Sequence, residues 1–492
     1  MTSTDAAPSG FPAEHAPALN AACVHAHVYQ PPREDPRTGE VPVEVSAAPM
    51  HDWNERITAE CYRPMAAARV LRSDGTLDRA INLYAHLSFD VGPTLGVWLD
   101  RFAPDVMASM VAGDRDSCAR SDGHGGAIAH PWVHAILPLA SARDRSTLIA
   151  WGIADFVHRF GRRPEGMWMP ETAADTATLE ALADHGIVFT IVAPHQLVSV
   201  DGPSIDRTQP VGVALPSGRT MVVFTYDGAL AHGVAFGELL RDGDRLAAAL
   251  SEPAALAEPH EPEGSAPEGP GSAPAGLRAL ATDAETFGHH HRFGEMALAR
   301  AIDRLGGQGL ELVSYAEWLH RSGWQQRAAL VEDTSWSCAH GIERWRSDCG
   351  CRIDVVADSS QQWRAPLRAA IDWLVARSVE LTETFARSAL VDPWAARDAY
   401  AEVLIGALTP RAFAAAHAPD DHRGEARDWM EAHRHLLMAQ SSCAWFFDHA
   451  DGHEVGIILA QAQVAIELLE TLCGVELDGE WQPLLRQLTA VI

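Results

Sequence analysis

Short apolar runs alternate with longer amphipathic segments over most of the chain. Residues 21–29 (AACVHAHVY), 186–194 and 220–228 are short and rich in apolar and β-branched residues, a composition typical of buried strands. Residues 146–160 and 176–186 instead repeat apolar residues at helical spacing, and the second segment ends in glycine, a common helix stop. Alternating strands and helices predict a parallel α/β fold, and polar residues at the strand ends favour a barrel.

The pattern changes in the last third of the chain. Residues 362–390 and 455–475 are long amphipathic patterns with helical spacing. We therefore expect a catalytic barrel over residues 1–330 and a helical C-terminal domain over residues 331–492. Residues 252–275 are rich in Pro, Gly, Ala, Ser and Glu and carry no apolar period, which predicts a flexible insertion within the barrel.

Charge and composition limit the kinds of partner that this chain can bind. The formal net charge is −28, and all 38 basic residues are arginine. Such an acidic chain repels nucleic acid phosphates and anionic membranes, so we expect neither as a partner; a neutral polysaccharide fits better. The absence of lysine excludes a lysine Schiff base or a lysine general base.

The N-terminal residues have neither the cationic region nor the apolar run of a secretory signal. No stretch reaches the ~18 uninterrupted apolar residues of a membrane helix. We therefore expect a cytoplasmic protein whose eight cysteines are reduced thiols or ligands. The sequence leaves the oligomeric state open.

Carboxylates follow two predicted strands. Glu171 comes after Trp-Met-Pro, and Asp283 and Glu285 follow the apolar run 277–282. In a barrel these strand ends face the active-site mouth. Glycoside hydrolysis needs two such carboxylates, one to attack the anomeric carbon and one to protonate the leaving oxygen. The structural alternative places Glu171 in the first turn of the next helix and Asp283 at a helix cap.

Histidines form a second signal. His25 and His27 share one face of the first strand, His130 and His134 are four residues apart, and residues 289–291 are all histidine. Imidazoles can bond sugar hydroxyls or coordinate a metal. A metal-dependent polysaccharide deacetylase or amidohydrolase-like enzyme, with His25, His27 and Asp283 as ligands, is the alternative function. A non-catalytic glucan-binding barrel is the second alternative.

A cysteine-rich segment follows the barrel pattern. Cys338, His340, Cys349 and Cys351 have C-x-H and C-x-C spacings, which differ from the usual zinc knuckle. We interpret them as thiols without a metal and keep zinc as the alternative.

Four stretches, residues 25–32, 125–139, 166–171 and 283–288, resemble in order the sequence regions of glycoside hydrolase family 57, and residues 310–319 resemble its fifth region. The resemblance implies an incomplete (β/α)7 barrel followed by a helical region that closes the cleft. It implies a retaining mechanism on α-glucan or malto-oligosaccharide without a cofactor. Activities in the family include α-amylase, 4-α-glucanotransferase and branching enzyme.

The same resemblance assigns roles to residues, with Glu171 as nucleophile and Asp283 as general acid/base. The C-terminal segments 335–345 and 438–454 resemble a poorly characterised helical domain attached to one subgroup. Neither pattern nor resemblance separates hydrolysis from transfer. The residues expected to bind substrate are His25, His27, Gln30, His134, Trp168, Asp227, Glu285 and Trp336.

Overall fold

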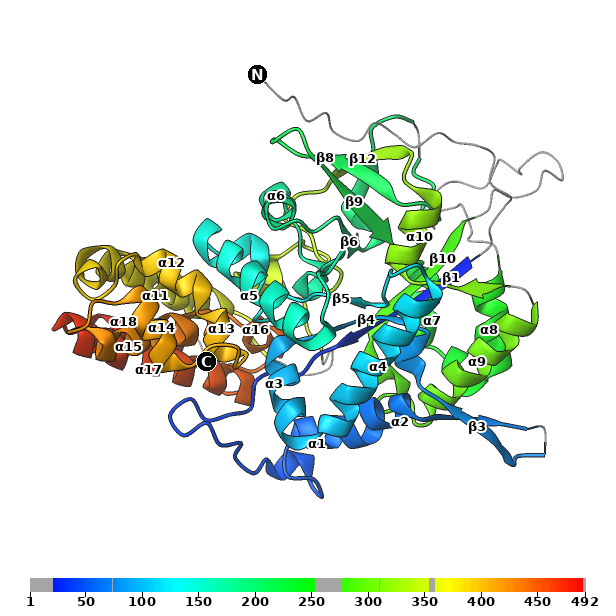
Figure 1. Ribbon diagram of the computed structural model, residues 1–492, viewed down its shortest axis with the longest axis horizontal. Coiled ribbons are helices and arrows are strands. Elements are labelled where there is room, and N and C mark those ends of the chain that lie inside the picture. Colours follow the sequence, from blue (N-terminus) through cyan, green and yellow to red (C-terminus); the bar gives the residue numbers. More distant parts are fainter. Residues whose placement is uncertain are drawn as a thin grey trace.

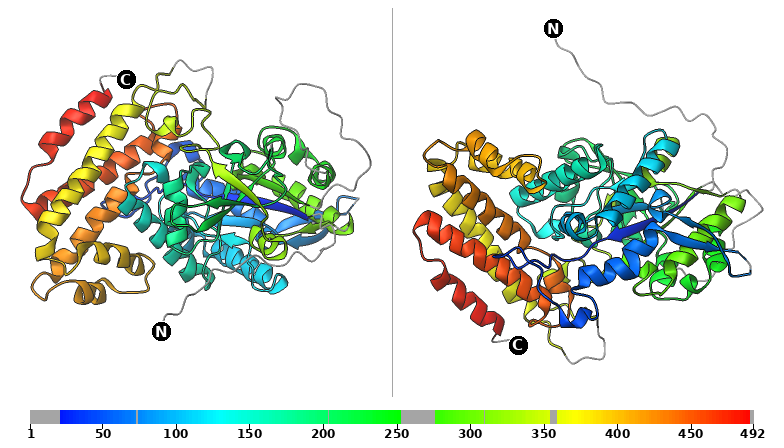
Figure 2. Two further views of the ribbon diagram at one scale, coloured as in Figure 1. Left: turned by 90° about the horizontal axis from the view of Figure 1, so that it is seen from above. Right: turned by 60° about the horizontal axis from the view of Figure 1, so that its bottom comes forward.

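The computed structural model describes residues 21–72, 74–202, 204–252, 276–308, 310–353 and 359–489. A barrel-like α/β part is built from elements of the first five of these segments, and a layer of helices, α11 to α18, lies along one side of it (Figures 1 and 2). The predicted insertion at 252–275 lies outside the described residues, except for residue 252.

The barrel is built from seven parallel strand positions among the described residues, which confirms the predicted incomplete (β/α)7 barrel. In spatial order they are β10 (Leu277–Asp283), β1 (Ala21–Val28), β4 (Ser88–Val91), β5 (Ala127–Ile128), the bridge residues Gly166 and Met167, β6 (Phe189–Val192) and β9 (Thr220–Thr225). Near the open edge between β9 and β10, the Asp227 amide donates to the Ala279 carbonyl oxygen (2.8 Å).

Shorter strands extend this framework. They are β11 (Glu311–Leu312) on β1, the hairpin of β2 (Ala68–Leu71) and β3 (Leu77–Ile81), and, beside β9, β8 (Val211–Ala214), β12 (Gln326–Leu330) and β7 (Leu197–Ser199). The helices of the barrel part are α1 (Trp53–Ile57), α2 (Arg63–Ala66), α3 (Pro93–Phe102), α4 (Pro104–Arg120), α5 (Ala142–Phe160), α6 (Thr176–Asp184), α7 (Gly228–Ala235), α8 (Gly243–Ser251), α9 (Gly294–Gln308) and α10 (Tyr315–Ser322).

Local sequence explains these elements. All eight residues of β1 are buried, as expected for a central strand covered on both faces. Helix α5 begins at Ser141, whose hydroxyl accepts from the Asp144 amide (3.1 Å), and ends at Gly161 in the left-handed conformation. Asp175 caps α6 in the same way through the Thr178 amide (2.7 Å).

The helical layer comprises α11 (Arg364–Phe385), α12 (Pro393–Ala399), α13 (Ala401–Leu404), α14 (Pro410–His417), α15 (Arg423–Met438), α16 (Cys443–Phe446), α17 (His453–Cys473) and α18 (Asp478–Thr489). By length and composition alone α17 could cross a membrane (mean hydropathy 1.5), yet it packs against α11, α15 and α16.

The helical layer is tied to the barrel by a buried ion pair. Arg397 of α12 bonds the Asp144 carboxylate of α5 (2.7 Å), and both side chains are almost fully buried. The Trp151 indole N–H of α5 donates to the Arg397 carbonyl oxygen (3.0 Å). These contacts join α12 to α5 and so attach the helical layer to the barrel.

Candidate active site

Three strands present polar side chains at the same level of the barrel. In the ladder register His27 of β1 pairs with Asp90 of β4 on one side and with Asp283 of β10 on the other. Residues in register point to the same face of a sheet, and the carboxyl ends of barrel strands form the active-site mouth. The structure thus brings His27 and Asp283 together, as the sequence predicts.

Asp90 holds the two histidines of β1 in place. Its carboxylate, fully buried, accepts from His27 Nδ1 (2.9 Å) and His25 Nε2 (3.1 Å). Burial alone would raise the pKa of Asp90, but the charge on His27 and both hydrogen bonds hold it well below its usual value. Burial alone would lower the pKa of His27, but Asp90 overrides this effect and raises it to about 9. His27 is therefore an imidazolium at neutral pH.

A chain of histidines continues from His27 towards the helical layer. His27 Nε2 lies 3.3 Å from His134 Nε2, and His134 Nδ1 lies 2.7 Å from the hydroxyl of Ser442. Burial lowers the pKa of His134 well below its usual value. A neutral His134 accepts a hydrogen bond from the Nε2–H of the His27 imidazolium at one nitrogen and donates one to the Ser442 hydroxyl at the other. The segment between α15 and α16 therefore reaches the site.

His25 and Trp168 lie below the site and are fully buried. Both His25 ring nitrogens are used, one by the Ser88 hydroxyl (3.0 Å) and one by Asp90 (3.1 Å). The Trp168 indole stacks on the His25 ring (centroids 4.7 Å apart) and contacts Trp336 edge-on (5.1 Å). Neither offers a face to a sugar, so the expectation of direct substrate contact is corrected: they position their neighbours.

Glu171 lies in a short 3-10 turn with φ +58°, a left-handed conformation that is uncommon for a non-glycine residue and costs backbone energy. One carboxylate oxygen, Oε2, accepts from the Trp336 indole N–H (3.0 Å) and from the Ser337 hydroxyl. The Trp336 amide also donates to the Glu171 carbonyl oxygen (3.0 Å). Among the described residues none donates to Oε1, which leaves that oxygen available for chemistry.

Asp283 ends β10 and is exposed, whereas Thr282 and Ala284 on either side are buried, so solvent reaches this carboxyl group. The surrounding protein partly removes the Asp283 carboxyl group from water, and this desolvation is the largest cause that raises its pKa to about 7. The His27 charge opposes this rise, and the carboxylates of Glu285 and Glu171 add to it. Asp283 thus exchanges its proton near neutral pH.

Glu285 sits in the 3-10 turn after β10 and is buried, held by the Tyr62 hydroxyl and the Gln30 side-chain amide (2.8 Å to Oε1). Burial raises the pKa of Glu285, and these two hydrogen bonds oppose the rise. Gln30 is therefore occupied with Glu285. Asp227 caps α7 at the Leu230 amide (2.8 Å) and pairs with Arg278 (3.1 Å). No other predicted site residue in the described part of the chain bonds the Asp227 side chain, and its substrate role stays a prediction.

Sequence reasoning missed Asp90, Tyr62, Ser337 and Ser442. Asp90 left a usable signal, because it is an acidic residue in a short stretch where Leu87, Phe89 and Val91 alternate with polar residues just before Gly-Pro. The others are ordinary polar residues whose roles depend on contacts from distant segments; Ser442 and His134 are 308 positions apart.

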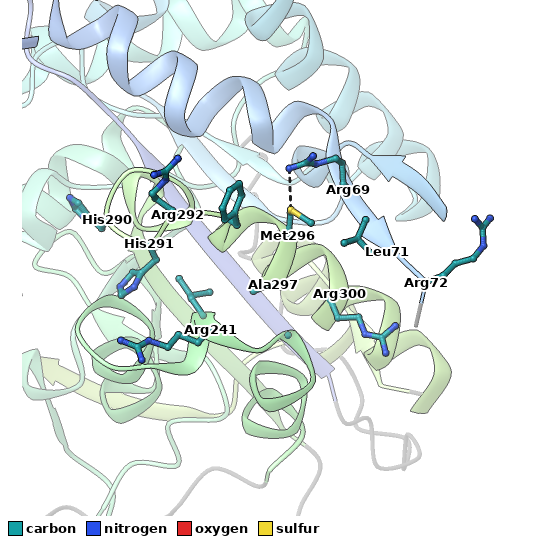
Figure 3. A pocket seen from close by; sticks show the side chains of 13 residues that line it. Arg69, Leu71, Arg72, Arg241, His290, His291, Arg292, Met296, Ala297 and Arg300 are labelled. Atoms are coloured by element: carbon teal, nitrogen blue, oxygen red, sulfur yellow. Dashed lines mark hydrogen bonds between the residues drawn. The ribbon is translucent and has the colours of Figure 1, made fainter. Parts of the chain in front are cut away.

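A cavity of about 870 Å³ lies beside α9 (Figure 3), and neither Glu171 nor His27 is among the residues that line it. It is lined mainly by basic side chains, and Arg69, Arg241 and Arg292 are among them. The residues that line it do not include Asp283 either, so this cavity is separate from the carboxylate site.

Two groups of described residues could hold a metal ion. The first is the imidazoles of His27, His130 and His134 at the site. The second is Cys338, His340, Cys349 and Cys351, on the segment that follows Trp336 and Ser337.

Comparisons with known proteins agree with this geometry. A family described as "Glycosyl hydrolase family 57" matches residues 121–329, and "Domain of unknown function (DUF3536)" matches residues 360–490. No curated protein matches the chain.

Solved structures share the fold at low sequence identity. The exo-type maltose-forming amylase from Pyrococcus sp. ST04 has 16% identity and a TM-score of 0.71, covering 94% of this chain and 82% of that one. A GH57-type branching enzyme from Pyrococcus horikoshii has 14% identity and a TM-score of 0.56, covering 96% of each chain. The 4-alpha-glucanotransferase from Thermococcus litoralis has 13% identity and a TM-score of 0.55, covering 92% of this chain and 60% of that one.

The protein is thus an incomplete α/β barrel with carboxyl groups at the carboxyl ends of its strands. More particularly, residues 121–329 match the glycosyl hydrolase family 57 model and residues 360–490 match the DUF3536 model, in agreement with the resemblance seen in the sequence.

Proposed function

We propose that this protein is a retaining enzyme acting on α-glucan, with Glu171 as nucleophile and Asp283 as general acid/base. The observation that carries the proposal is the contrast between the two carboxyl groups. Glu171 is fixed by two donors on one oxygen and has the other free, whereas the pKa of Asp283 is raised to about 7. A carboxylate held in place by hydrogen bonds, together with a second carboxyl group whose pKa is raised, fits the nucleophile and acid pair of a retaining glycosidase.

The reaction then follows in two balanced steps. Glu171 Oε1 attacks the anomeric carbon while the glycosidic C–O bond breaks and Asp283 gives its proton to the departing oxygen. This step forms a β-glycosyl ester on Glu171. Asp283, now a carboxylate, removes a proton from water or from a sugar hydroxyl, which attacks the same carbon and releases Glu171.

His27 and the helical layer support this pair. The imidazolium of His27, in register with Asp283, keeps the pKa of that acid from rising further. The segment Ser441–Cys443 reaches His134 and Tyr29: the Cys443 thiol lies 3.5 Å from the Tyr29 hydroxyl. We therefore assign to the helical layer the closing of the site over bound glucan.

The names of the similar solved structures suggest the substrate. They are a maltose-forming amylase, a branching enzyme and a 4-alpha-glucanotransferase. α-Glucan or malto-oligosaccharide is accordingly the proposed substrate here, with hydrolysis and transfer both compatible with the site. The eight free cysteines suit a cytoplasmic setting.

One observation favours a second candidate, a metal-dependent hydrolase, because three imidazoles meet beside Asp283. A ligating imidazole must be neutral, however, and the pKa of His27 is raised to about 9, so a metal there would have to displace a proton. His25 has both nitrogens bonded within the protein and cannot serve as the ligand that the sequence suggested. The carboxylate mechanism is therefore preferred.

The test is turnover of maltoheptaose and amylose by the wild type and by Glu171→Gln and Asp283→Asn, with and without EDTA. We expect each variant to lose several orders of magnitude in rate. New reducing ends with shorter chains indicate hydrolysis, and redistributed chain lengths without new reducing ends indicate transfer.

Glu317→Gln is the matched control, because Glu317 is a buried glutamate on α10 that pairs with Arg321, outside the site. It should keep wild-type turnover. Near wild-type rates in Glu171→Gln would refute the assignment. Glucan binding without turnover in the wild type would support the non-catalytic alternative, and prompt loss of activity in EDTA would support the metal-dependent one.

A further inference from the structure

Four potential metal ligands converge on the segment between β12 and α11. Cys338, His340, Cys349 and Cys351 each offer one ligand atom, and these four atoms lie within 4.8 Å of one another. Cys338 is buried, the other two cysteines are half-buried, and His340 is exposed. Gly350 separates two of the cysteines and has φ +80°, so the chain turns sharply and brings both thiols to the same side.

The separations fit a tetrahedral ion. The Cys338 sulfur lies 3.9 Å from that of Cys349 and 3.8 Å from that of Cys351, and the Cys351 sulfur lies 3.5 Å from His340 Nδ1. A disulfide needs ~2.05 Å, so the thiols are not bonded to one another. Around tetrahedral zinc, bond lengths of ~2.3 Å to sulfur and ~2.05 Å to nitrogen place sulfurs about 3.8 Å apart and sulfur and nitrogen about 3.5 Å apart.

The charges of two nearby arginines also fit a zinc site. Arg364 and Arg344 are buried, and their guanidinium groups bond the carbonyl oxygens of Cys351 and Ser337 (3.0 Å each). Within the described part of the chain, neither forms an ion pair with a carboxylate. A buried cation needs a counter-charge. Zinc bound by three thiolates and one neutral imidazole carries a net negative charge, which supplies it.

We propose that Cys338, His340, Cys349 and Cys351 bind one structural zinc ion that positions the segment carrying Trp336 and Ser337 against Glu171. Four protein ligands fill the tetrahedral coordination, so no position remains open for substrate, as in structural zinc sites. Soft thiolate ligands favour zinc among the common divalent ions.

The position along the chain connects this ion to the active site. Cys338 directly follows Ser337 and lies two residues after Trp336, and both of these neighbours donate to Glu171 Oε2. The ion therefore acts through the loop and does not touch substrate. This inference stands apart from the glucan activity, because the site would bind zinc whatever the barrel acts on.

The experiment is metal analysis of the full-length protein purified under reducing conditions. We expect about one zinc per chain, and release of that zinc by a thiol-specific mercurial, followed with a chromogenic chelator. Cys338→Ser and Cys349→Ser should lose the ion, whereas Cys473→Ser, which alters a half-buried cysteine on α17, should retain it.

His27→Gln distinguishes this site from the imidazole group of the barrel, because it should keep its zinc. Should the cysteine variants fail to fold, titration of zinc into the metal-depleted wild type gives the answer without them. Zinc retained in soluble cysteine variants, zinc lost with His27→Gln, or a wild type that neither contains nor takes up zinc would each overturn the proposal. The readout is metal content, so failure of the glucan assignment would leave it unaffected.

Discussion

The sharpest prediction concerns the buried pair of Asp90 and His27. In Asp90→Asn the charge that keeps His27 protonated is removed while the shape of the side chain is kept. Burial lowers the pKa of His27, whereas Asp90, with smaller contributions from Asp283 and Glu285, raises it. The net rise from 6.5 to about 9 corresponds to ~3 kcal/mol in favour of the imidazolium. Asp90 supplies the two largest contributions that raise this pKa, so without it the pKa of His27 should fall.

The assay is an NMR pH titration of protein with labelled histidine, in which His27→Gln identifies the resonance. Asp114→Asn is the matched control, because Asp114 is also buried but pairs with Arg162, away from the site. It should leave the titration of His27 unchanged. An Asp90→Asn protein in which His27 still titrates near the wild-type value would refute the reasoning.

The same pair has a consequence for stability. The pKa of His27 is higher in the folded protein than in the unfolded chain, so its contribution is complete below pH 6.5 and is lost as pH rises through about 9. The difference in thermal stability between wild type and Asp90→Asn should therefore shrink over this range.

Three further predictions concern the active site and the contact between α12 and α5. The rate should fall as pH rises through about 7, because Asp283 then loses the proton it must donate; a flat pH–rate profile would contradict this. Ser442→Ala removes the hydroxyl at the end of the histidine chain and should lower kcat up to about tenfold, with no change if the helical layer plays no part. Arg397→Met leaves the buried Asp144 carboxylate without its charge partner and should cost ~3–5 kcal/mol of stability by thermal unfolding, whereas the exposed Arg387→Met should cost little.

Much of the fold could be predicted because the apolar pattern was strong. The run at 21–29 became the central strand β1, and the helical spacing at 146–160 and 455–475 became α5 and α17. Periodicity reports which face of an element is buried, and a buried strand or helix leaves that mark directly in the sequence.

The site could be predicted only in part. Glu171 and Asp283 could be proposed because they follow predicted strands. Sequence does not give burial, however, so Trp168 was expected to contact a sugar and instead lies wholly inside the protein. Asp227 lies at a strand end as well, yet it serves as a helix cap and an ion-pair partner. Ser442 could not be found, because its contact with the site depends on how the helical layer packs on the barrel.

The most direct test of the central claim is to trap the glycosyl ester on Glu171. The wild type is incubated with a slow fluorinated glucosyl fluoride, digested and analysed by peptide mass spectrometry. The account predicts one fluoroglucosyl group on the peptide that contains Glu171, and none in Glu171→Gln. A label on another carboxylate, still present in Glu171→Gln, would contradict it.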